Sequence, residues 1–388
     1  MRKDVVIIGA GAAGLMCAIE AGKRGRKVAV LDHAGKTGRK VRVSGGGNCN
    51  FTNMNTGPEH YISLNPHFCK SALGRFTPDD FVSLLNRHGI GHHEKEDGQL
   101  FCNEGAGAVI GMLVKECREA GVDIHLNCRI SDIDKKKSFK VMTGSGSFLS
   151  ESLVVATGGL SYPKLGATGF GHKIAEKFGL GVTALKPALV PLTFSGNELS
   201  LFNSLSGVSV KAGVGCNNRE FCGNILFTHK GLSGPAILQV SSYWNSGDVI
   251  LIDLLPGIDI RKIFIEKHQS RMEIKNFLAM YLPKRFIQEW CEVYIRSKPL
   301  YLYTDADLRE ISGRLKDWRI KPTGTEGYNM AEVTLGGVDT NGLSSKTMEA
   351  GNVRGLYFIG EVIDVTGQLG GYNLQWAWSS GHAAGQFV

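Results

Sequence analysis

The sequence lacks the features by which membrane proteins, secreted proteins and zinc proteins are usually recognised. No apolar run approaches the roughly 20 residues of a membrane-spanning helix, and Met1-Arg2-Lys3 leads directly into a strand-like run, which leaves no room for a signal peptide. The nine cysteines are odd in number and include no C-x-x-C pair, which fits reduced thiols better than disulfides or a zinc site. We therefore expect a cytoplasmic protein with no membrane partner and no bound metal.

The remaining composition is that of an ordinary globular chain. Of its 388 residues, 43% are hydrophobic and 21% are charged, and this length allows two or three domains with a large core. The formal net charge of +8 permits an anionic partner, such as a nucleotide or RNA, without requiring one.

The first 14 residues carry a glycine pattern of the form G-x-G-x-x-G. Val and Ile at residues 5–8 predict a short buried strand, and the periodicity that starts at residue 15 predicts a helix. Between them, Gly9 would allow a tight turn, Gly11 would let the backbone approach a pyrophosphate, and Gly14 would let helix and strand pack closely. The backbone amides of Ala12 and Ala13 would then face the phosphates from the positive end of the helix.

A carboxylate follows the second predicted strand at the spacing that dinucleotide-binding folds use. Residues 27–31 predict this strand, and Asp32 lies 18 residues after Gly14, where it can accept hydrogen bonds from the adenosine ribose hydroxyls. A plain glycine-rich turn is the alternative, but it does not explain Asp32. The pattern therefore predicts a dinucleotide site.

The next segment, residues 35–53, is rich in Gly, Ser, Asn and Thr, which disfavours a helix. A loop of hydrogen-bond donors directly after the ribose carboxylate could wrap the rest of a dinucleotide, with Arg39 and Lys40 as phosphate or ribose contacts. The alternative is a flexible surface loop.

Within this loop, the run GRKVRVSGGGNCNFTN (residues 38–53) resembles the signature of the BaiN/YhiN-like family of NAD(P)/FAD-dependent oxidoreductases, a branch of the glutathione-reductase-type flavoproteins. Family members usually have Arg where this chain has Asn48, so a cation near the cofactor or substrate is missing here. The strand that ends in Ala-Thr-Gly-Gly (residues 156–159) also resembles a motif of these flavoproteins, although any buried strand can end in small residues.

The resemblance implies an FAD site built from both ends of the chain. The carboxylate of Glu361 would contact the ribityl or pyrophosphate part, Ile130 would lie near the adenine, and the final helix would point at flavin N1 and the C2 carbonyl. Its positive end would stabilise the anionic reduced flavin. The further cofactor residues that the resemblance implies are Ser44, Gly45, Gly46, Thr157, Gly158, Gly360, Gly371, Tyr372, Asn373 and Leu374.

Three residues are candidates for the substrate side. His229 lies beside Lys230 on a glycine-bounded loop that also resembles a family motif, and a histidine there could act as acid or base near neutral pH. It could equally do no more than brace the loop. Cys49 and Asn50 are the other two candidates.

The sequence predicts an α/β fold in three parts. A Rossmann-like FAD-binding domain, with a parallel sheet and a β-meander over 132–155, would comprise residues 1–190 and 323–388. Short alternating strands predict a small β-barrel over 191–255, and amphipathic stretches at 258–280 and 285–295 predict a helical subdomain over 256–322. Residues 58–128 predict mainly helices.

The helical insertion holds 14 Lys and Arg against 9 Asp and Glu, so it carries +5 of the net charge of +8. Charged helices are usually only solvated faces, but a local surplus hints at an anionic macromolecule. Activities ascribed to the family are amine or amino-acid oxidation, reduction of unsaturated steroid acids and dihydrouridine formation in ribosomal RNA. Residues 65–81 and 93–101 resemble the members tied to the RNA activity.

The leading hypothesis is an FAD-dependent reductase that uses NAD(P)H as its electron donor and uridine in ribosomal RNA as its substrate. The alternatives are a small-molecule amine oxidase or enoate-type reductase, and a non-catalytic, flavin-stabilised RNA-binding protein. The oligomeric state stays open.

Overall fold

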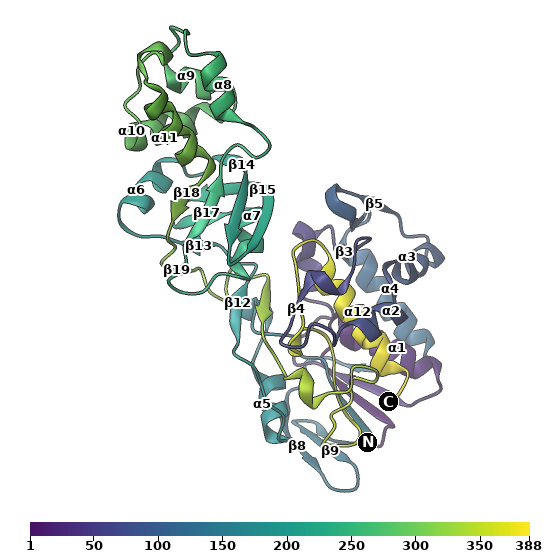
Figure 1. Ribbon diagram of the computed structural model, residues 1–388. Helices are drawn as coiled ribbons and strands as arrows, with labels where there is room; N and C mark the ends of the chain where they lie inside the picture. Colours follow the sequence, from purple (N-terminus) through teal and green to yellow (C-terminus); the bar gives the residue numbers. More distant parts are fainter. The chain divides into compact units, whose positions relative to one another are not determined.

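The computed structural model describes residues 1–388, and the chain divides into two compact units (Figure 1). Unit 1 comprises residues 1–186 and 333–388, and unit 2 comprises residues 187–332. The first boundary lies close to the predicted residue 190. The chain returns to unit 1 ten residues later than predicted, and residues 324–325 in this interval form a strand that pairs within unit 2.

Unit 1 is built on a five-stranded parallel sheet. Its order is β21-β11-β1-β2-β7, so a strand from the C-terminal part of the chain completes a sheet begun at the N-terminus. Four of the strands are short and fully buried, as expected where both faces of a parallel sheet are covered, whereas the edge strand β7 has the sequence Asp-Ile-His and is only partly buried. Their bounds are β1 (Val5–Ile8), β2 (Val28–Leu31), β7 (Asp123–His125), β11 (Ser152–Val155) and β21 (Leu356–Phe358).

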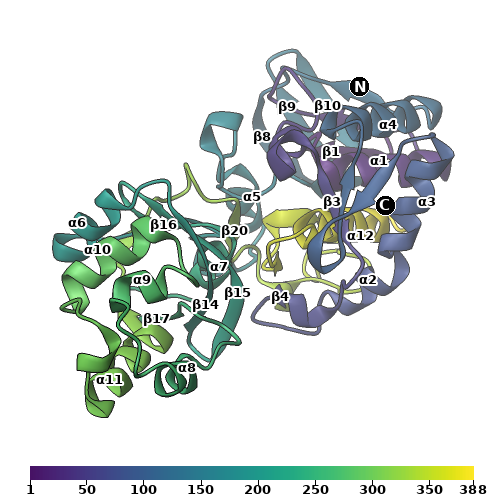
Figure 2. The ribbon, with the colours of Figure 1, turned by 90° about the horizontal axis from the view of Figure 1, so that it is seen from above.

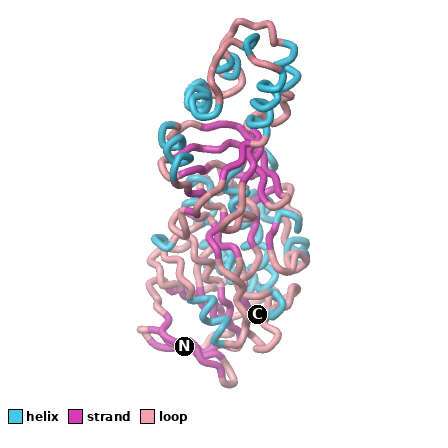
Figure 3. The backbone as a smooth tube through the Cα atoms, turned by 60° about the vertical axis from the view of Figure 1, so that its left-hand side comes forward, coloured by secondary structure: helices cyan, strands magenta, loops and turns pink.

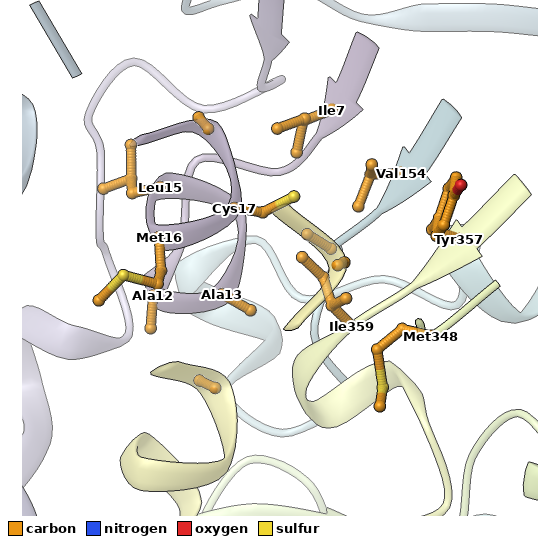
Figure 4. Close-up of a cluster of buried hydrophobic side chains, with 14 of the residues drawn as sticks. Ile7, Ala12, Ala13, Leu15, Met16, Cys17, Val154, Met348, Tyr357 and Ile359 are labelled. Atoms are coloured by element: carbon orange, nitrogen blue, oxygen red, sulfur yellow. The ribbon is translucent and has the colours of Figure 1, made fainter. Parts of the chain in front are cut away.

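Two long helices from opposite ends of the chain pack against each other in unit 1. α1 (Ala12–Lys23) and α12 (Tyr372–Gly385) lie side by side in Figures 1 and 2. The approach is so close that a Cβ at Gly381 would lie 2.5 Å from the carbonyl oxygen of Ala13. Figure 4 shows side chains of α1 and of the neighbouring strands, such as Ile7 and Val154, in the core of this unit.

The other elements of unit 1 surround this core. The predicted meander is present as an antiparallel sheet of β8 (Ile130–Lys135), β9 (Phe139–Thr143) and β10 (Gly146–Ser150), but the last part of its predicted range is β11, which belongs to the parallel sheet. The remaining helices are α2 (Lys70–Arg75), α3 (Pro78–Arg87), α4 (Ala106–Glu119) and α5 (Phe170–Lys177).

The prediction that residues 58–128 are mainly helical is wrong for several short segments. A small antiparallel sheet has the order β3-β6-β5, and β4 pairs with β22. These strands are β3 (Asn50–Asn53), β4 (Tyr61–Ile62), β5 (His92–Glu94), β6 (Gln99–Cys102) and β22 (Thr366–Gly367).

Unit 2 contains a seven-stranded antiparallel sheet. Its order is β18-β17-β14-β15-β16-β13-β19, so the hydrogen-bonded sheet ends at β18 and β19 rather than closing into the predicted barrel. Its strands are β13 (Leu192–Thr193), β14 (Ser209–Cys216), β15 (Arg219–Thr228), β16 (Gly231–Ser233), β17 (Ile250–Asp253), β18 (Trp318–Ile320) and β19 (Gly324–Thr325). β12 (Lys186–Ala188) and β20 (Val333–Leu335) lie where the chain crosses from one unit to the other.

The helices of unit 2 share one hydrophobic core with this sheet. The rings of Phe227 and Phe286, one from the sheet and one from a helix, have centroids 5.5 Å apart. Figure 3 shows helices of this unit, in cyan, beyond its magenta strands. The helices are α6 (Gly196–Ser204), α7 (Pro235–Ser241), α8 (Ile260–Glu266), α9 (Ile274–Leu278), α10 (Lys284–Tyr294) and α11 (Asp305–Lys316).

The long helix predicted over 258–280 is divided into α8 and α9. Between them the backbone pairs with a distant segment: the Leu300 N–H donates to the Met272 carbonyl oxygen (3.0 Å), and the Ile274 N–H donates to the Lys298 carbonyl oxygen (3.1 Å). Tertiary pairing therefore overrides the amphipathic periodicity here. Across the whole chain, no helix has both the length and the apolar character needed to cross a bilayer.

Candidate dinucleotide site

The turn between β1 and α1 requires two of its glycines for packing within the protein itself. Gly9 has φ of +112°, and a Cβ there would lie 2.3 Å from the carbonyl oxygen of Ala156. A Cβ at Gly14 would lie 2.0 Å from the carbonyl oxygen of Gly9. Neither position accepts a side chain unless the backbone moves, so the sequence interpretation of both glycines is consistent with the geometry.

Gly11 differs from these two, because no atom beyond Gly11 and its two chain neighbours lies within 4 Å of where its Cβ would be. Its φ of −87° and ψ of −169° are extended values that any residue can adopt. Nothing in the protein therefore requires glycine here, while open space in front of the turn fits a ligand that approaches the backbone. Gly11 is also the N-cap of α1 without a side-chain cap, so the first-turn amides at Ala12 and Ala13 can face an anion.

The carboxylate of Asp32 accepts hydrogen bonds from the backbone and so holds the glycine turn between β1 and α1 in place. Its Oδ2 accepts the N–H of Ala10 at 2.7 Å, and its Oδ1 accepts the N–H of Ala34 at 2.8 Å. An ionised carboxylate has about four acceptor positions, so two remain for ribose hydroxyls. The sequence predicted only the ribose contact, and the bond to Ala10 adds a second task, which is to hold the glycine turn in place.

The segment that leads to Ile130 lies beside Asp32. The Cys128 N–H donates to the Asp32 carbonyl oxygen at 2.8 Å, and the Asn127 N–H donates to the Ala34 carbonyl oxygen at 3.0 Å. Ile130 itself is half-buried at the start of β8. This arrangement suits the predicted position of Ile130 near an adenine, next to Asp32, the predicted ribose contact.

Lys40 and Glu361 form an ion pair between the two ends of the chain. The Lys40 Nζ lies 2.5 Å from Glu361 Oε2 and donates to Ser161 Oγ at 2.7 Å. The other carboxylate oxygen of Glu361 accepts the Thr334 N–H at 2.9 Å and the Ser161 hydroxyl at 3.2 Å. Arg39 is not part of this network; its guanidinium reaches the Lys164 carbonyl oxygen at 3.4 Å.

Sequence reasoning missed Ser161 and Thr334 as members of this site. Ser161 lies two residues after the Ala-Thr-Gly-Gly run, so its place in the sequence was an available signal. Thr334 carried no local signal, because its contact depends on the fold. Thr157 and Gly158 lie at the same edge, and a Cβ at Gly158 would lie 3.9 Å from Glu361 Oε2.

The loop after Lys40 is held in place by hydrogen bonds within the loop itself. Gly45 and Gly46 have φ of +55° and +66°, left-handed values that favour glycine. The Ser44 hydroxyl donates to the Val41 carbonyl oxygen at 2.7 Å, and the Ser44 carbonyl oxygen accepts the Cys49 N–H at 3.0 Å. Gly46 is exposed, and nothing in the protein fills the space where its Cβ would lie.

The start of α12 is anchored to the loop through β3. Gly371 has φ of +97°, and a Cβ there would lie 2.3 Å from the Thr52 carbonyl oxygen. The Asn50 amide, oriented so that both its ends find partners, accepts the Gly371 N–H at 3.3 Å and donates to the Leu100 carbonyl oxygen at 3.1 Å. Asn50 therefore braces the N-terminus of α12, a task that the sequence did not indicate.

The other predicted residues of α12 are also in structural contacts. Tyr372 stacks on His60 with ring centroids 4.6 Å apart, and Leu374 packs against the core. The Asn373 amide accepts the Gly367 N–H at 2.9 Å and donates to the carbonyl oxygen of the same residue at 2.7 Å. Gly360 has φ of +71°, and a Cβ there would lie 2.9 Å from Ala13 Cβ.

Cys49 and His229 have different environments. Cys49 is fully buried with φ of +54°, and burial raises the pKa of its thiol to about 12. Such a thiol stays protonated, which favours a structural task. His229 is exposed on the turn between β15 and β16 in unit 2, and its task as acid or base toward a substrate stays a prediction.

Comparison with known proteins identifies relatives along almost the whole chain. The chain is 49% identical to a ribosomal RNA dihydrouridine synthase of Escherichia coli, over 99% of this chain and 98% of the relative. It is 46% identical to a ribosomal RNA dihydrouridine synthase of Haemophilus influenzae, over 97% and 96%. A 3-dehydro-bile acid delta(4,6)-reductase of Clostridium scindens is 28% identical over 98% and 97%.

The family assignment follows from a match that spans both ends of the chain. The profile of the HI0933-like protein Rossmann domain matches residues 3–387. This match confirms the predicted family resemblance and the Rossmann-like fold of unit 1. The chain therefore belongs to the HI0933-like Rossmann family.

Proposed function

We propose that this protein is an FAD-dependent oxidoreductase that reduces uridine in ribosomal RNA to dihydrouridine, with NAD(P)H as electron donor. The observation that carries the proposal is the identity of 49% and 46%, along nearly the entire chain, to two relatives named ribosomal RNA dihydrouridine synthase. The residues of unit 1 support it because they fit the cofactor.

The fit to FAD rests on the glycine turn between β1 and α1, where a side chain at Gly11 would occupy the space that a cofactor needs. The space in front of Gly11 is open, the first-turn amides of α1 are uncapped, and Asp32 retains acceptor positions for a ribose. Lys40 adds a positive charge whose position is fixed by Glu361 and Ser161. Arg39, Gly45 and Gly46 are exposed or half-exposed candidates for the remaining contacts.

When bound, FAD would supply a carrier that accepts a hydride from NAD(P)H and delivers it to the C5=C6 bond of uracil. The balanced reaction converts uridine, NAD(P)H and one proton to dihydrouridine and NAD(P)⁺. The carbon that does not receive the hydride must be protonated, so the protein has to supply or admit an acid. We propose His229 for this task, because it is an exposed histidine on a short turn.

Complementation of an Escherichia coli strain that lacks its 49% identical relative tests the proposal. Dihydrouridine in ribosomal RNA would be mapped by chemical reduction and reverse transcription, after expression of the wild-type chain, the Gly11→Ala variant or an empty vector. We expect the wild-type chain to restore the dihydrouridine signal and Gly11→Ala to restore less of it at equal protein level. If expressed, flavin-loaded wild-type protein restores none, the RNA substrate is wrong.

The proton-donor task of His229 needs its own readout. In purified His229→Asn, we expect FAD content and reduction of the flavin by NAD(P)H to match the wild type, while dihydrouridine formation falls at least tenfold. A variant that forms dihydrouridine at the wild-type rate would show that His229 only braces its loop.

A small-molecule enoate-type reductase is the second candidate, since the Clostridium scindens relative is named a delta(4,6)-reductase. Purified protein that oxidises NAD(P)H with a conjugated steroid enone, but leaves ribosomal RNA unchanged, would favour this candidate. An amine oxidase would instead bleach with an amine and recolour in air with release of peroxide.

A further inference from the structure

The positive charge of unit 2 is concentrated in one segment. Residues 261–285 hold seven Lys and Arg against two Asp and Glu, whereas the rest of the range 256–322 holds seven of each. The whole surplus of five charges therefore comes from α8, α9, the connection between them and the start of α10.

Six of the seven basic residues are exposed, and most of the seven lack acidic partners. Of the seven basic side chains, only Lys275 forms an ion pair, with Glu273 at 3.2 Å. Arg285 donates to the backbone oxygen of Ser206 at 3.3 Å and so has a structural contact. The other five are exposed to solvent: Arg261, Lys262, Lys267, Arg271 and Lys284.

The two short helices α8 and α9, which flank Lys267 and Arg271, are fixed to each other through their buried sides. Phe264 of α8 and Phe277 of α9 have ring centroids 5.7 Å apart. Because α8 buries Ile260 and Phe264, its solvent side presents Arg261 and Lys262. The apolar side of α8 is thus already occupied by the core and is not available to a lipid bilayer.

Exposed rings and apolar side chains lie among the charges. The Tyr301 N–H donates to the Ser270 carbonyl oxygen at 3.2 Å, which places this 47% exposed tyrosine next to Arg271 in space. Tyr281 is 37% exposed and Ile265 is 62% exposed within the same segment. Cationic side chains for phosphates, together with exposed rings for unpaired bases, are the combination that single-stranded nucleic acids require.

We propose that residues 261–285 together with Tyr301, named here the basic face, bind the ribosomal RNA substrate through its phosphates and its unstacked bases. The RNA identity of the ligand rests on the proposed function. An acidic protein partner would use the same charges but would have no need of the exposed tyrosines, so RNA accounts for both features.

The test is RNA binding by a variant that removes three unpartnered charges, Lys262→Gln, Lys267→Gln and Arg271→Gln. The matched control is Lys136→Gln, Lys137→Gln and Lys140→Gln, which removes the same charge from the hairpin between β8 and β9 and from β9 in unit 1. The probe is ribosomal RNA from the Escherichia coli strain that lacks the relative, and binding is measured between about 50 and about 200 mM salt.

The expected result follows from counterion release. The slope of log K against log salt is negative, and at roughly 0.7 per phosphate contact on a single strand, three lost contacts reduce its magnitude by about 2. The affinity ratio of wild type to variant then falls about 20-fold across this fourfold salt range. The control triple variant should keep the wild-type slope, and all three proteins should keep equal FAD content and equal rates of flavin reduction.

A second variant separates stacking from charge. Tyr301→Ala should weaken RNA binding about fivefold or more without changing the salt slope. A basic-face triple variant with the slope and affinity of the wild type would overturn the proposal. If the wild type binds RNA but forms no dihydrouridine, the proposed function fails, while the salt slopes still decide whether the basic face is the binding surface.

Discussion

Replacement of Gly11 by Ala should separate cofactor binding from folding. No atom beyond this residue and its two chain neighbours lies within 4 Å of the new Cβ, and the backbone angles are extended, so the free protein has no reason to rearrange. Ala is a poorer N-cap than Gly, at a cost of up to about 1 kcal/mol. The loss of glycine entropy in the unfolded chain offsets about 0.4–1 kcal/mol. We therefore expect the free energy of unfolding of FAD-free protein to change by less than about 0.5 kcal/mol.

The same variant should bind FAD much more weakly. A methyl group in front of the turn displaces the pyrophosphate from at least one backbone N–H, and a hydrogen bond to a charged group contributes about 1.5–3 kcal/mol. This loss corresponds to a roughly 10- to 150-fold increase in the Kd for FAD, at 1.4 kcal/mol for each tenfold step.

Gly14→Ala is the matched comparison, with the same methyl group three residues along. Its Cβ would lie 2.0 Å from the Gly9 carbonyl oxygen, so the helix must move away from the strand. Overpacking of this kind costs about 1–3 kcal/mol, of which better helix propensity returns up to about 1 kcal/mol. This variant should lose both stability and FAD affinity.

Urea unfolding of the FAD-free proteins and titration with FAD, followed by flavin fluorescence, measure the two quantities. If Gly11→Ala binds FAD as tightly as the wild type, the pyrophosphate does not lie against this turn. If Gly11→Ala is instead as unstable as Gly14→Ala, the open space in front of the turn is not real.

Three further predictions concern single contacts. Glu361→Gln should lower the free energy of unfolding, measured in urea titrations, by about 1 kcal/mol, because the amide oxygen of Gln can still accept the Thr334 N–H. Glu361→Ala should lower it by about 1–3 kcal/mol, and equal losses in the two variants would contradict the network. Burial opposes ionisation of Glu116, but hydrogen bonds from Lys23 and His88 outweigh it and lower its pKa, so its stabilising contribution is present near neutral pH and is lost as pH falls through that lowered pKa. The stability difference between wild type and Glu116→Gln should therefore shrink on acidification below about pH 4, and a difference that grows would refute the assignment. Only Cys222 is exposed among the nine thiols, so a thiol reagent should label one site in the folded wild type, none in folded Cys222→Ser and nine in the unfolded wild type. Rapid labelling of Cys49 in the folded protein would contradict its burial.

The parts of the fold that the sequence predicted well are set by local patterns. The first strand, the glycine turn and the following helix depend on neighbouring residues, and the structure has them at residues 5–23. The start of α3 is also marked locally: it begins at Pro78, and the hydroxyl of the preceding Thr77 accepts the Asp80 N–H in a capping box. A periodicity or a cap can be recognised without knowledge of distant residues.

The parts that were missed depend on contacts between distant residues. β5 consists of His92, His93 and Glu94, polar residues without alternation, and it exists because it pairs with β6. The break between α8 and α9 is caused by pairing with residues 298–300, which no helical periodicity reveals.

The candidate site shows the same division. Asp32 was predicted from its spacing, but its bond to Ala10 required the folded turn. Glu361 was implied by family resemblance as a cofactor contact, whereas its ion pair with Lys40, 321 residues away, is visible only in three dimensions.

The most direct test of the central claim is the cofactor content of the purified wild-type chain. The protein would be denatured, and the released small molecules would be identified by chromatography and mass spectrometry and quantified against protein concentration. We predict one FAD per chain, either as purified or after incubation with FAD and removal of the excess. A folded protein that carries no flavin under either condition would contradict the account.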